Sequence, residues 1–490
     1  MFTRIYSLLF TNRGSRQIVA KNTFWLTFSN FGGRLLRAII IVYAARVLGA
    51  EEYGIFAYAL SVAALLTIFV DFGIGPLLTR EASKIGHDEK KRIQIISTSF
   101  YVRGVLLIVG ALMIVFGTPL FTRIEEAVSL LPIVALIMIL DSWRDFGLSI
   151  IRSMEKMEWE AFLYFLTNIG VVAAGFVFIY LYPSALGIAY GYALGVGIGT
   201  IATFYVLRKE LRGILSNFDK RYVRLMFTAA LPFAVSGILA GVMINTDILF
   251  IGYFRSAEEV GFYSAVLRII QLLYLLPAVL AVSSFPLFAR LAESDNHKFR
   301  SILERMLGIM FLAALPLALG GIITARPLTE VIFGAQYIPA TPAFQVLLLT
   351  LLANFPAVIL SNAVFAYNQQ RALITFSVIG AISNVILDIL FIPIFGILGS
   401  AWSTFGAQAV SNIYLWWRMK KINHFSIRTY VLQLLPSTLL MAIIVYFLTW
   451  LLGFHVLISI VLGAAAYLGF LAWQKNPLFE ELRSILRPVF

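Results

Sequence analysis

The sequence predicts an all-α membrane protein that crosses the bilayer about fourteen times. Three observations predict this fold class. Apolar residues make up 60% of the 490 positions and charged residues only 13%. Apolar runs of about twenty residues recur along the chain, and three short motifs occur twice. Soluble domains carry roughly 25% charged residues, so the composition excludes a soluble enzyme and a disordered protein.

The apolar runs have the length and pattern of membrane-spanning helices. A helix needs about 20 residues to cross the hydrocarbon core, whereas a β-barrel strand needs about ten and alternates apolar with polar residues. Turn-forming residues separate the runs, as at Gly49, Gly117–Pro119, Pro183 and Gly453. The predicted spans are 22–47, 54–79, 94–116, 130–151, 161–181, 185–207, 225–252, 260–286, 306–325, 344–366, 372–394, 397–417, 429–451 and 455–473.

The loop charges predict the orientation. If the N-terminus is cytoplasmic, the predicted inside segments hold 29 Lys and Arg residues and the outside loops hold 3. Cytoplasmic loops carry the excess of Lys and Arg, so we expect a multi-pass protein of the cell (cytoplasmic) membrane with both termini in the cytoplasm. The same rule explains the net charge of +13 without a nucleic-acid partner.

Paired motifs indicate an internal repeat with offsets of 207 to 212 residues. Each copy holds six spans, an even number, so both copies have the same orientation and are related by a pseudo-two-fold axis along the membrane normal. The pairs are Ala50–Phe56 with Ala257–Tyr263, Pro76–Arg80 with Pro286–Arg290, and Leu186–Tyr190 with Leu398–Trp402.

This repeat predicts the domain organisation. Two six-helix lobes are joined by a basic linker, and two extra helices follow the second lobe. The predicted parts are a cytoplasmic amphipathic segment at 1–21, a first lobe at 22–207, a cytoplasmic linker at 208–224, a second lobe at 225–417, and the last two spans with the cytoplasmic C-terminus at 418–490.

The chain lacks the residues that most enzymes would need. It has no cysteine and only four scattered histidines. No metal-ligand, phosphate-loop or nucleophile motif occurs in it. We therefore expect no catalytic residue, no metal and no cofactor.

The first predicted span carries a polar stripe. Asn30, Arg34 and Arg37 follow one another at spacings of four and three, which places them on one helix face. Arg34 lies about 12 residues, or roughly 18 Å, from the cytoplasmic end, which is too far for its side chain to reach the surface. Two like charges on one face favour a cavity that binds an anion. The alternative is structural pairing with carboxylates of other helices.

Other charged residues lie in spans two to four. Asp141 and Arg144 share a face of span four, where they can neutralise each other, so a structural role and a cavity role are equally open. Asp71 either pairs with an arginine of span one or serves as a proton or sodium site. For Arg103 we expect a side chain that extends to the membrane surface.

The second lobe holds fewer charges inside its spans. Arg268 and Gln271 share a face of span eight and are candidates for substrate contact. Asp247 and Asp388 join the two carboxylates of the first lobe as ion-coupling candidates. Both lie near predicted outer ends, so a hydrated position at the membrane surface is the alternative.

Several motifs resemble a known family, the Wzx-like polysaccharide flippases. This family belongs to the multidrug/oligosaccharidyl-lipid/polysaccharide (MOP) exporter superfamily. The resemblance implies a two-lobed, MATE/MOP-like fold and non-enzymatic movement of a polyprenyl-pyrophosphate-linked oligosaccharide from the inner to the outer leaflet, for cell-surface polysaccharide assembly. The motifs are Arg34–Arg37, Ala44–Gly54, Asp71–Gly75, Thr79–Glu81, Asn245–Asp247, Ile251–Phe254 and Val260–Tyr263.

These observations predict transport by alternating access through a cationic central cavity, with proton or sodium coupling as the candidate drive. Expected partners are the lipid-linked oligosaccharide, membrane lipid and glycan-assembly proteins, and the chain is expected to be a monomer. A cation-coupled multidrug antiporter and a peptidoglycan-precursor flippase are the alternatives on the same scaffold. The substrate-binding candidates are Asn30, Arg34, Arg37, Arg144, Arg268 and Gln271, and the ion-coupling candidates are Asp71, Asp141, Asp247 and Asp388.

Overall fold

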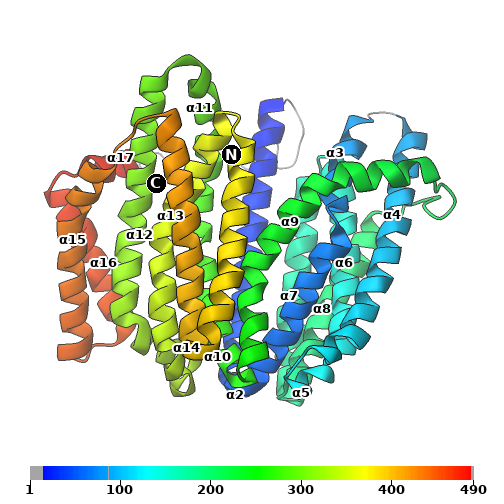
Figure 1. Ribbon diagram of the computed structural model, residues 1–490, viewed down its shortest axis with the longest axis horizontal. Coiled ribbons are helices and arrows are strands. Elements are labelled where there is room, and N and C mark those ends of the chain that lie inside the picture. The colour runs from blue at the N-terminus through cyan, green and yellow to red at the C-terminus, as the bar shows by residue number, and fades with distance from the viewer. Residues whose placement is uncertain (1–14, 86–87, 487–490) are drawn as a thin grey trace, which may run out of the picture. The chain divides into compact units, whose positions relative to one another are not determined.

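The computed structural model describes residues 15–85 and 88–486, and every regular element in this part of the chain is a helix (Figure 1). It divides into two compact units, Met1–Gly261 and Phe262–Phe490. We call them the first and the second unit. The lobe boundaries expected from the sequence stay predictions. Residues 1–14 of the predicted N-terminal segment lie outside the described residues.

The first unit contains the helices α2 (Ser15–Asp71), α3 (Ile74–Lys84), α4 (Glu89–Leu112), α5 (Glu125–Val128), α6 (Leu131–Ser153), α7 (Met157–Leu181), α8 (Ala185–Val206) and α9 (Lys220–Phe254). The first turn of α10 (Ala257–Leu273) also belongs to this unit. The remainder of α10 and the following helices form the second unit. These are α11 (Leu275–Ser294), α12 (Asn296–Phe333), α13 (Thr341–Ala366), α14 (Gln370–Ile422), α15 (Arg428–Tyr446), α16 (Val456–Trp473) and α17 (Pro477–Leu486).

Eleven helical stretches of the described chain are long and apolar enough to cross a membrane. Two of them are interrupted where a glycine has a positive φ, at Gly49 (φ 84°) in α2 and at Gly396 (φ 58°) in α14. A straight helix as long as α14 would extend about 80 Å, more than twice the ~30 Å hydrocarbon core. The helices α2 and α14 are therefore each long enough to cross the membrane twice. The expected all-helical membrane fold is confirmed, and the number of fourteen spans stays a prediction.

Small residues let the helices of the first unit approach closely. A Cβ atom at Gly195 of α8 would lie 2.2 Å from the backbone nitrogen of Val171 in α7. A Cβ atom at Gly33 of α2 would lie 2.9 Å from Asn168 Nδ2 in α7. At Gly195 a side chain would separate the two backbones, and at Gly33 it would collide with side chains of α7. The α2 helix consequently packs against α7 one turn before Arg37.

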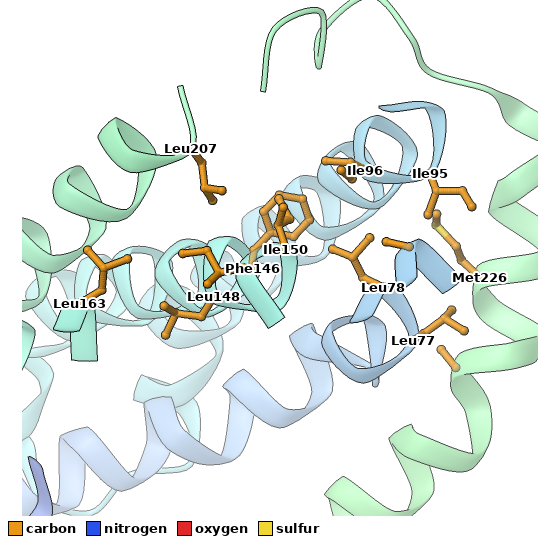
Figure 2. Close-up of a cluster of buried hydrophobic side chains, with 13 residues drawn as sticks. Leu77, Leu78, Ile95, Ile96, Phe146, Leu148, Ile150, Leu163, Leu207 and Met226 are labelled. Atoms are coloured by element: carbon orange, nitrogen blue, oxygen red, sulfur yellow. The ribbon is translucent and has the colours of Figure 1, made fainter. Parts of the chain in front are cut away.

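An apolar cluster closes one end of the first unit (Figure 2). It joins Leu78 of α3, Ile96 of α4, Phe146 of α6 and Met226 of α9, all of them buried. Thr79 Oγ1 of α3 also donates a hydrogen bond to the carbonyl oxygen of Ser149 (3.1 Å) in α6. These contacts fix α3, α4 and α6 against one another. The charged residues of α4 and α6 lie in the adjoining turns.

The last two predicted spans correspond to α15 and α16, which pack against α12 within the second unit. Tyr467 Oη of α16 donates to the carbonyl oxygen of Leu312 in α12 (2.8 Å). A Cβ atom at Gly463 would lie 2.3 Å from the side chain of Val445, so α15 and α16 also meet closely. Leu434 of α15 and Leu471 of α16 are fully buried in the apolar cluster that they share with α12.

Candidate functional site

Arg144 of α6 contacts two carboxylates of its own helix. Its Nη1 lies 2.7 Å from Asp141 Oδ1, and its Nη2 donates to Asp145 Oδ1 at 2.8 Å. The spacings of three and one place both aspartates beside the guanidinium. The local pairing that the sequence predicts is therefore present, and one buried cation is shared by two carboxylates.

Arg103 of α4 forms an ion pair across helices. Its side chain is only 2% exposed, its Nη1 lies 2.8 Å from Asp71 Oδ1, and its Nε and Nη2 donate to Ser142 Oγ at 3.0 and 2.9 Å. The prediction that Arg103 extends to the membrane surface is wrong. Asp71, at the end of α2, holds the arginine inside the unit, so Asp71 pairs with α4 and not with an arginine of the first span.

Arg37 of α2 makes a different set of contacts. Its Nε donates to Asn168 Oδ1 of α7 (3.1 Å), and its guanidinium carbon lies 5.5 Å from the ring centroid of Tyr192 in α8. Asn168 Nδ2 in turn donates to the carbonyl oxygen of Tyr164 (2.7 Å), which fixes the amide with its oxygen toward the arginine. Among the described residues no carboxylate lies within ion-pair distance of Arg37.

These residues form one charged cluster. Asp141 and Arg144 lie close enough to Arg37 to act on its charge, and Arg103 acts on both Asp141 and Asp145. We use the name charged cluster for Arg37, Asp71, Arg103, Asp141, Arg144 and Asp145. Three arginines face three aspartates, but the aspartates contact only Arg103 and Arg144. Arg37 therefore differs from the other two arginines of the cluster, because its contacts are with neutral groups.

The cluster unites four of the predicted substrate-binding and ion-coupling candidates, namely Arg37, Asp71, Asp141 and Arg144. Sequence reasoning missed Asn168 and Tyr192, which hold Arg37. An asparagine within the apolar run 161–181 was the available signal for Asn168. Tyr192 gave none, because it lies in a glycine-rich helix whose pattern indicates only close packing.

The remaining candidates lie elsewhere. Arg34 is exposed, and no hydrogen bond or ion pair joins it to another residue of the described chain. The side chain of Asn30 lies outside the described residues. In the second unit, Arg268 Nη1 donates to Gln271 Oε1 at 2.9 Å, so these two candidates contact each other.

Asp247 and Asp388 are buried, with exposed fractions of 2% and 0%. Asp247 lies in α9 of the first unit, and Asp388 lies in α14 of the second. This burial contradicts a hydrated environment for both carboxylates, and their position near the membrane surface stays a prediction. Neither belongs to the charged cluster.

The comparison with known families shows which family the chain belongs to. The family described as "Polysaccharide biosynthesis protein" matches residues 19–292, which is more than half of the chain. The chain belongs to this family. The family described as "MatE" matches residues 232–390. The resemblance to the flippases of the MOP superfamily is thereby confirmed.

Individual relatives extend over most of the chain. A Shigella flexneri protein named "Putative O-antigen transporter" is 23% identical over 79% of this chain and 94% of its own length. A Haloferax volcanii protein named "Probable low-salt glycan biosynthesis flippase Agl15" is 22% identical over 81% of this chain and 82% of its own. As a member of this family, the chain is a multi-pass membrane transporter and not an enzyme.

A solved structure shares the fold. The structure described as "Lipid II flippase MurJ, inward closed conformation" superposes with a TM-score of 0.74 over 92% of this chain and 98% of its own, at 19% identity. At that identity the likeness shows the fold alone. The MATE/MOP-like fold class expected from the sequence is confirmed.

Proposed function

We propose that the protein moves an oligosaccharide linked to polyprenyl pyrophosphate from the inner to the outer leaflet of the cytoplasmic membrane, where it serves surface polysaccharide assembly. Membership in the polysaccharide biosynthesis family supports this function. Two relatives that match about four fifths of the chain are named as an O-antigen transporter and a glycan flippase. The proposed orientation, with both termini in the cytoplasm, follows from the loop charges.

The observation that carries the proposal is the environment of Arg37. An ion inside a membrane span costs several kcal/mol unless it is paired. Arg103 and Arg144 meet this requirement with aspartates, whereas among the described residues Arg37 contacts the amide of Asn168 and the ring of Tyr192 and no carboxylate. An anionic guest would supply the missing charge. A pyrophosphate suits an arginine, because the planar guanidinium binds two oxygens at once.

The other candidates take further roles, each within its own unit. Arg34, which is exposed and lies almost one turn from Arg37, is the second cation for the pyrophosphate. Arg144 acts through the cluster, since two carboxylates already occupy its guanidinium. Arg268 and Gln271 are the proposed sugar contacts, because a paired guanidinium and amide offer donors and an acceptor to hydroxyl groups. Asn30, on the same polar stripe as Arg34 and Arg37, stays a candidate for substrate binding.

We place the coupling of transport to a proton or a sodium ion at the carboxylates of α6. Asp141 and Asp145 both lie within 2.8 Å of one guanidinium, so the three groups carry a net negative charge that a proton or a sodium ion can neutralise. Asp71 is fixed by Arg103 and is a weaker candidate. Asp247 and Asp388 stay candidates because they are buried carboxylates inside spans. Such a step would let the first unit alternate between two conformations.

The multidrug-antiporter alternative requires carboxylates that are available to an organic cation. Within the cluster each aspartate already contacts an arginine. An organic cation would have to displace an arginine from one of them, so this arrangement favours the anionic substrate over a drug cation.

Headgroup accessibility in proteoliposomes tests the proposal. A labelled lipid-linked oligosaccharide is loaded in one leaflet, and its appearance in the other is followed with an impermeant lectin or enzyme. We expect movement with the wild type and little with the double variant Arg34→Ala/Arg37→Ala. The matched control Arg371→Ala/Lys420→Ala removes the same charge at exposed positions. Equal rates for all three proteins would refute the role of the two arginines.

A further inference from the structure

A second polar site lies at the end of the first unit, apart from the charged cluster. It is a cavity of about 520 Å³ between the start of α4 and the segment 207–219 that precedes α9. No residue of the charged cluster lines it. The lining residues are Glu89, Lys90, Arg92, Ile93, Ile96, Lys209, Glu210 and Arg212.

The cavity is electropositive. Four cationic side chains from two segments outnumber two carboxylates, which leaves two positive charges. Nη2 of Arg92 is buried without a hydrogen-bond partner in the described part of the chain, as is Oε2 of Glu210. A buried charged donor that lacks an acceptor destabilises the protein. A ligand oxygen in the cavity would remove this destabilisation.

The walls are fixed before any ligand arrives. The segment 207–219 is bonded to α4, because Tyr101 Oη donates to the carbonyl oxygen of Leu215 (2.8 Å) and the backbone nitrogen of Asp219 donates to Thr98 Oγ1 (3.1 Å). Ile96, which is labelled in Figure 2, belongs to both the apolar cluster and the cavity lining. A preformed site of this kind loses little entropy on binding.

The two lining segments belong to the most basic of the predicted cytoplasmic loops. Segment 80–93 holds 5 Lys and Arg residues and segment 208–224 holds 6. Further along α4, Val105 and Ile108 are more than 60% exposed, as expected for side chains that face lipid. The cavity therefore lies where the membrane surface meets the cytoplasm.

We propose that this cavity binds a phosphate group at the cytoplasmic membrane surface. Arg92 and Arg212 offer planar forks to phosphate oxygens, while Lys90 and Lys209 add charge. The phosphate belongs either to the headgroup of an anionic phospholipid or to a soluble anion. The site is distinct from the arginines proposed to hold the transported pyrophosphate.

Two binding measurements on the full-length chain separate these sources. Phosphatidylglycerol retained by protein from mixed phosphatidylcholine nanodiscs is quantified by native mass spectrometry. Pyrophosphate is titrated into protein in nanodiscs of phosphatidylcholine alone and followed by calorimetry. The cavity variants are Arg92→Gln/Arg212→Gln and, should that one fold poorly, Lys209→Gln/Arg212→Gln at two exposed positions. The control Lys220→Gln/Arg224→Gln removes two exposed cations that do not line the cavity.

We expect the cavity variants to lose at least about tenfold in affinity for one of the probes, while the control binds like the wild type. A loss confined to phosphatidylglycerol identifies a lipid headgroup, and a loss for pyrophosphate identifies a soluble anion. Unchanged binding of both probes by the cavity variants overturns the proposal. An equal loss in the control also overturns it, because general surface charge would then explain the attraction.

Discussion

A Cβ atom at Gly54 would lie 1.8 Å from the carbonyl oxygen of Ala257, and one at Gly261 would lie 1.8 Å from the carbonyl oxygen of Ala50. These four residues are the first and fifth positions of the repeated motif, Ala50–Phe56 and Ala257–Tyr263. Within the first unit the two copies pack against each other reciprocally, with the glycine of each against the alanine of the other. The motif therefore encodes a close backbone contact.

Enlarging either glycine should separate these backbones. We expect Gly54→Ala and Gly261→Ala each to lower the free energy of unfolding by about 1–3 kcal/mol, the usual cost of overpacking. Thermal unfolding of the purified protein in detergent measures this. The control is Gly469→Ala in α16, where an added methyl group meets nothing within 4 Å. Similar melting temperatures for all the variants would contradict the close contact.

The ion pair of Asp71 with Arg103 predicts an asymmetry between two substitutions. The side chain of Asp71 is 30% exposed and that of Arg103 only 2%. Asp71→Asn leaves a buried arginine without its counter-charge and should cost about 3–5 kcal/mol of stability. Arg103→Gln leaves a carboxylate that water can reach and should cost less. Chemical denaturation of both variants checks the order, and a larger loss for Arg103→Gln would contradict the ion-pair geometry.

The sequence predicts local and repeated features well. Apolar length predicts the helices, and a spacing of three predicts the contact between Asp141 and Arg144 because both lie on one helix. It does not predict that Arg103 bonds to Asp71 and Ser142, or that Arg37 bonds to Asn168 131 positions away. Those contacts depend on which helices pack together, and no periodicity within one helix specifies that.

Asn168 offers a substitution that changes charge with little change in shape. Asn168→Asp would place a carboxylate against Arg37 Nε and so supply the counter-charge that we assign to the substrate. We expect a loss of lipid-linked oligosaccharide movement of about tenfold or more, since one charged contact is worth roughly 1.5–3 kcal/mol. Stability should change little, because the new ion pair with Arg37 offsets the lost hydrogen bond to the carbonyl oxygen of Tyr164. Flipping assays and melting curves on the same preparation measure both.

Asn168→Ala is the matched comparison for that substitution. It removes the acceptor without adding charge, so transport should fall less than in Asn168→Asp. If Asn168→Asp transports as well as the wild type, Arg37 does not serve an anionic substrate.

The two carboxylates that contact Arg144 are the proposed site through which an ion gradient changes the rate of flipping. In proteoliposomes with an imposed pH or sodium gradient, we expect the wild type to respond to the gradient. Asp141→Asn/Asp145→Asn should flip at a rate that no longer depends on it, because no group of α6 then takes up the ion. The pair Asp247→Asn and Asp388→Asn, tested in the same way, serves as the comparison. An unchanged gradient response in the α6 variant would exclude coupling at this site.

The role of Arg37 as the partner of the substrate's negative charge is tested most directly by comparing two lipids in one assay. One carries its oligosaccharide through pyrophosphate, and the other carries the same oligosaccharide through an uncharged glycosidic link. The wild type should flip the charged lipid faster. Arg37→Gln should lose most of that preference, because the other two arginines of the charged cluster each contact an aspartate and only Arg34 would remain for the pyrophosphate. A variant that keeps the full preference for the charged lipid would contradict the assignment of Arg37 as the pyrophosphate contact.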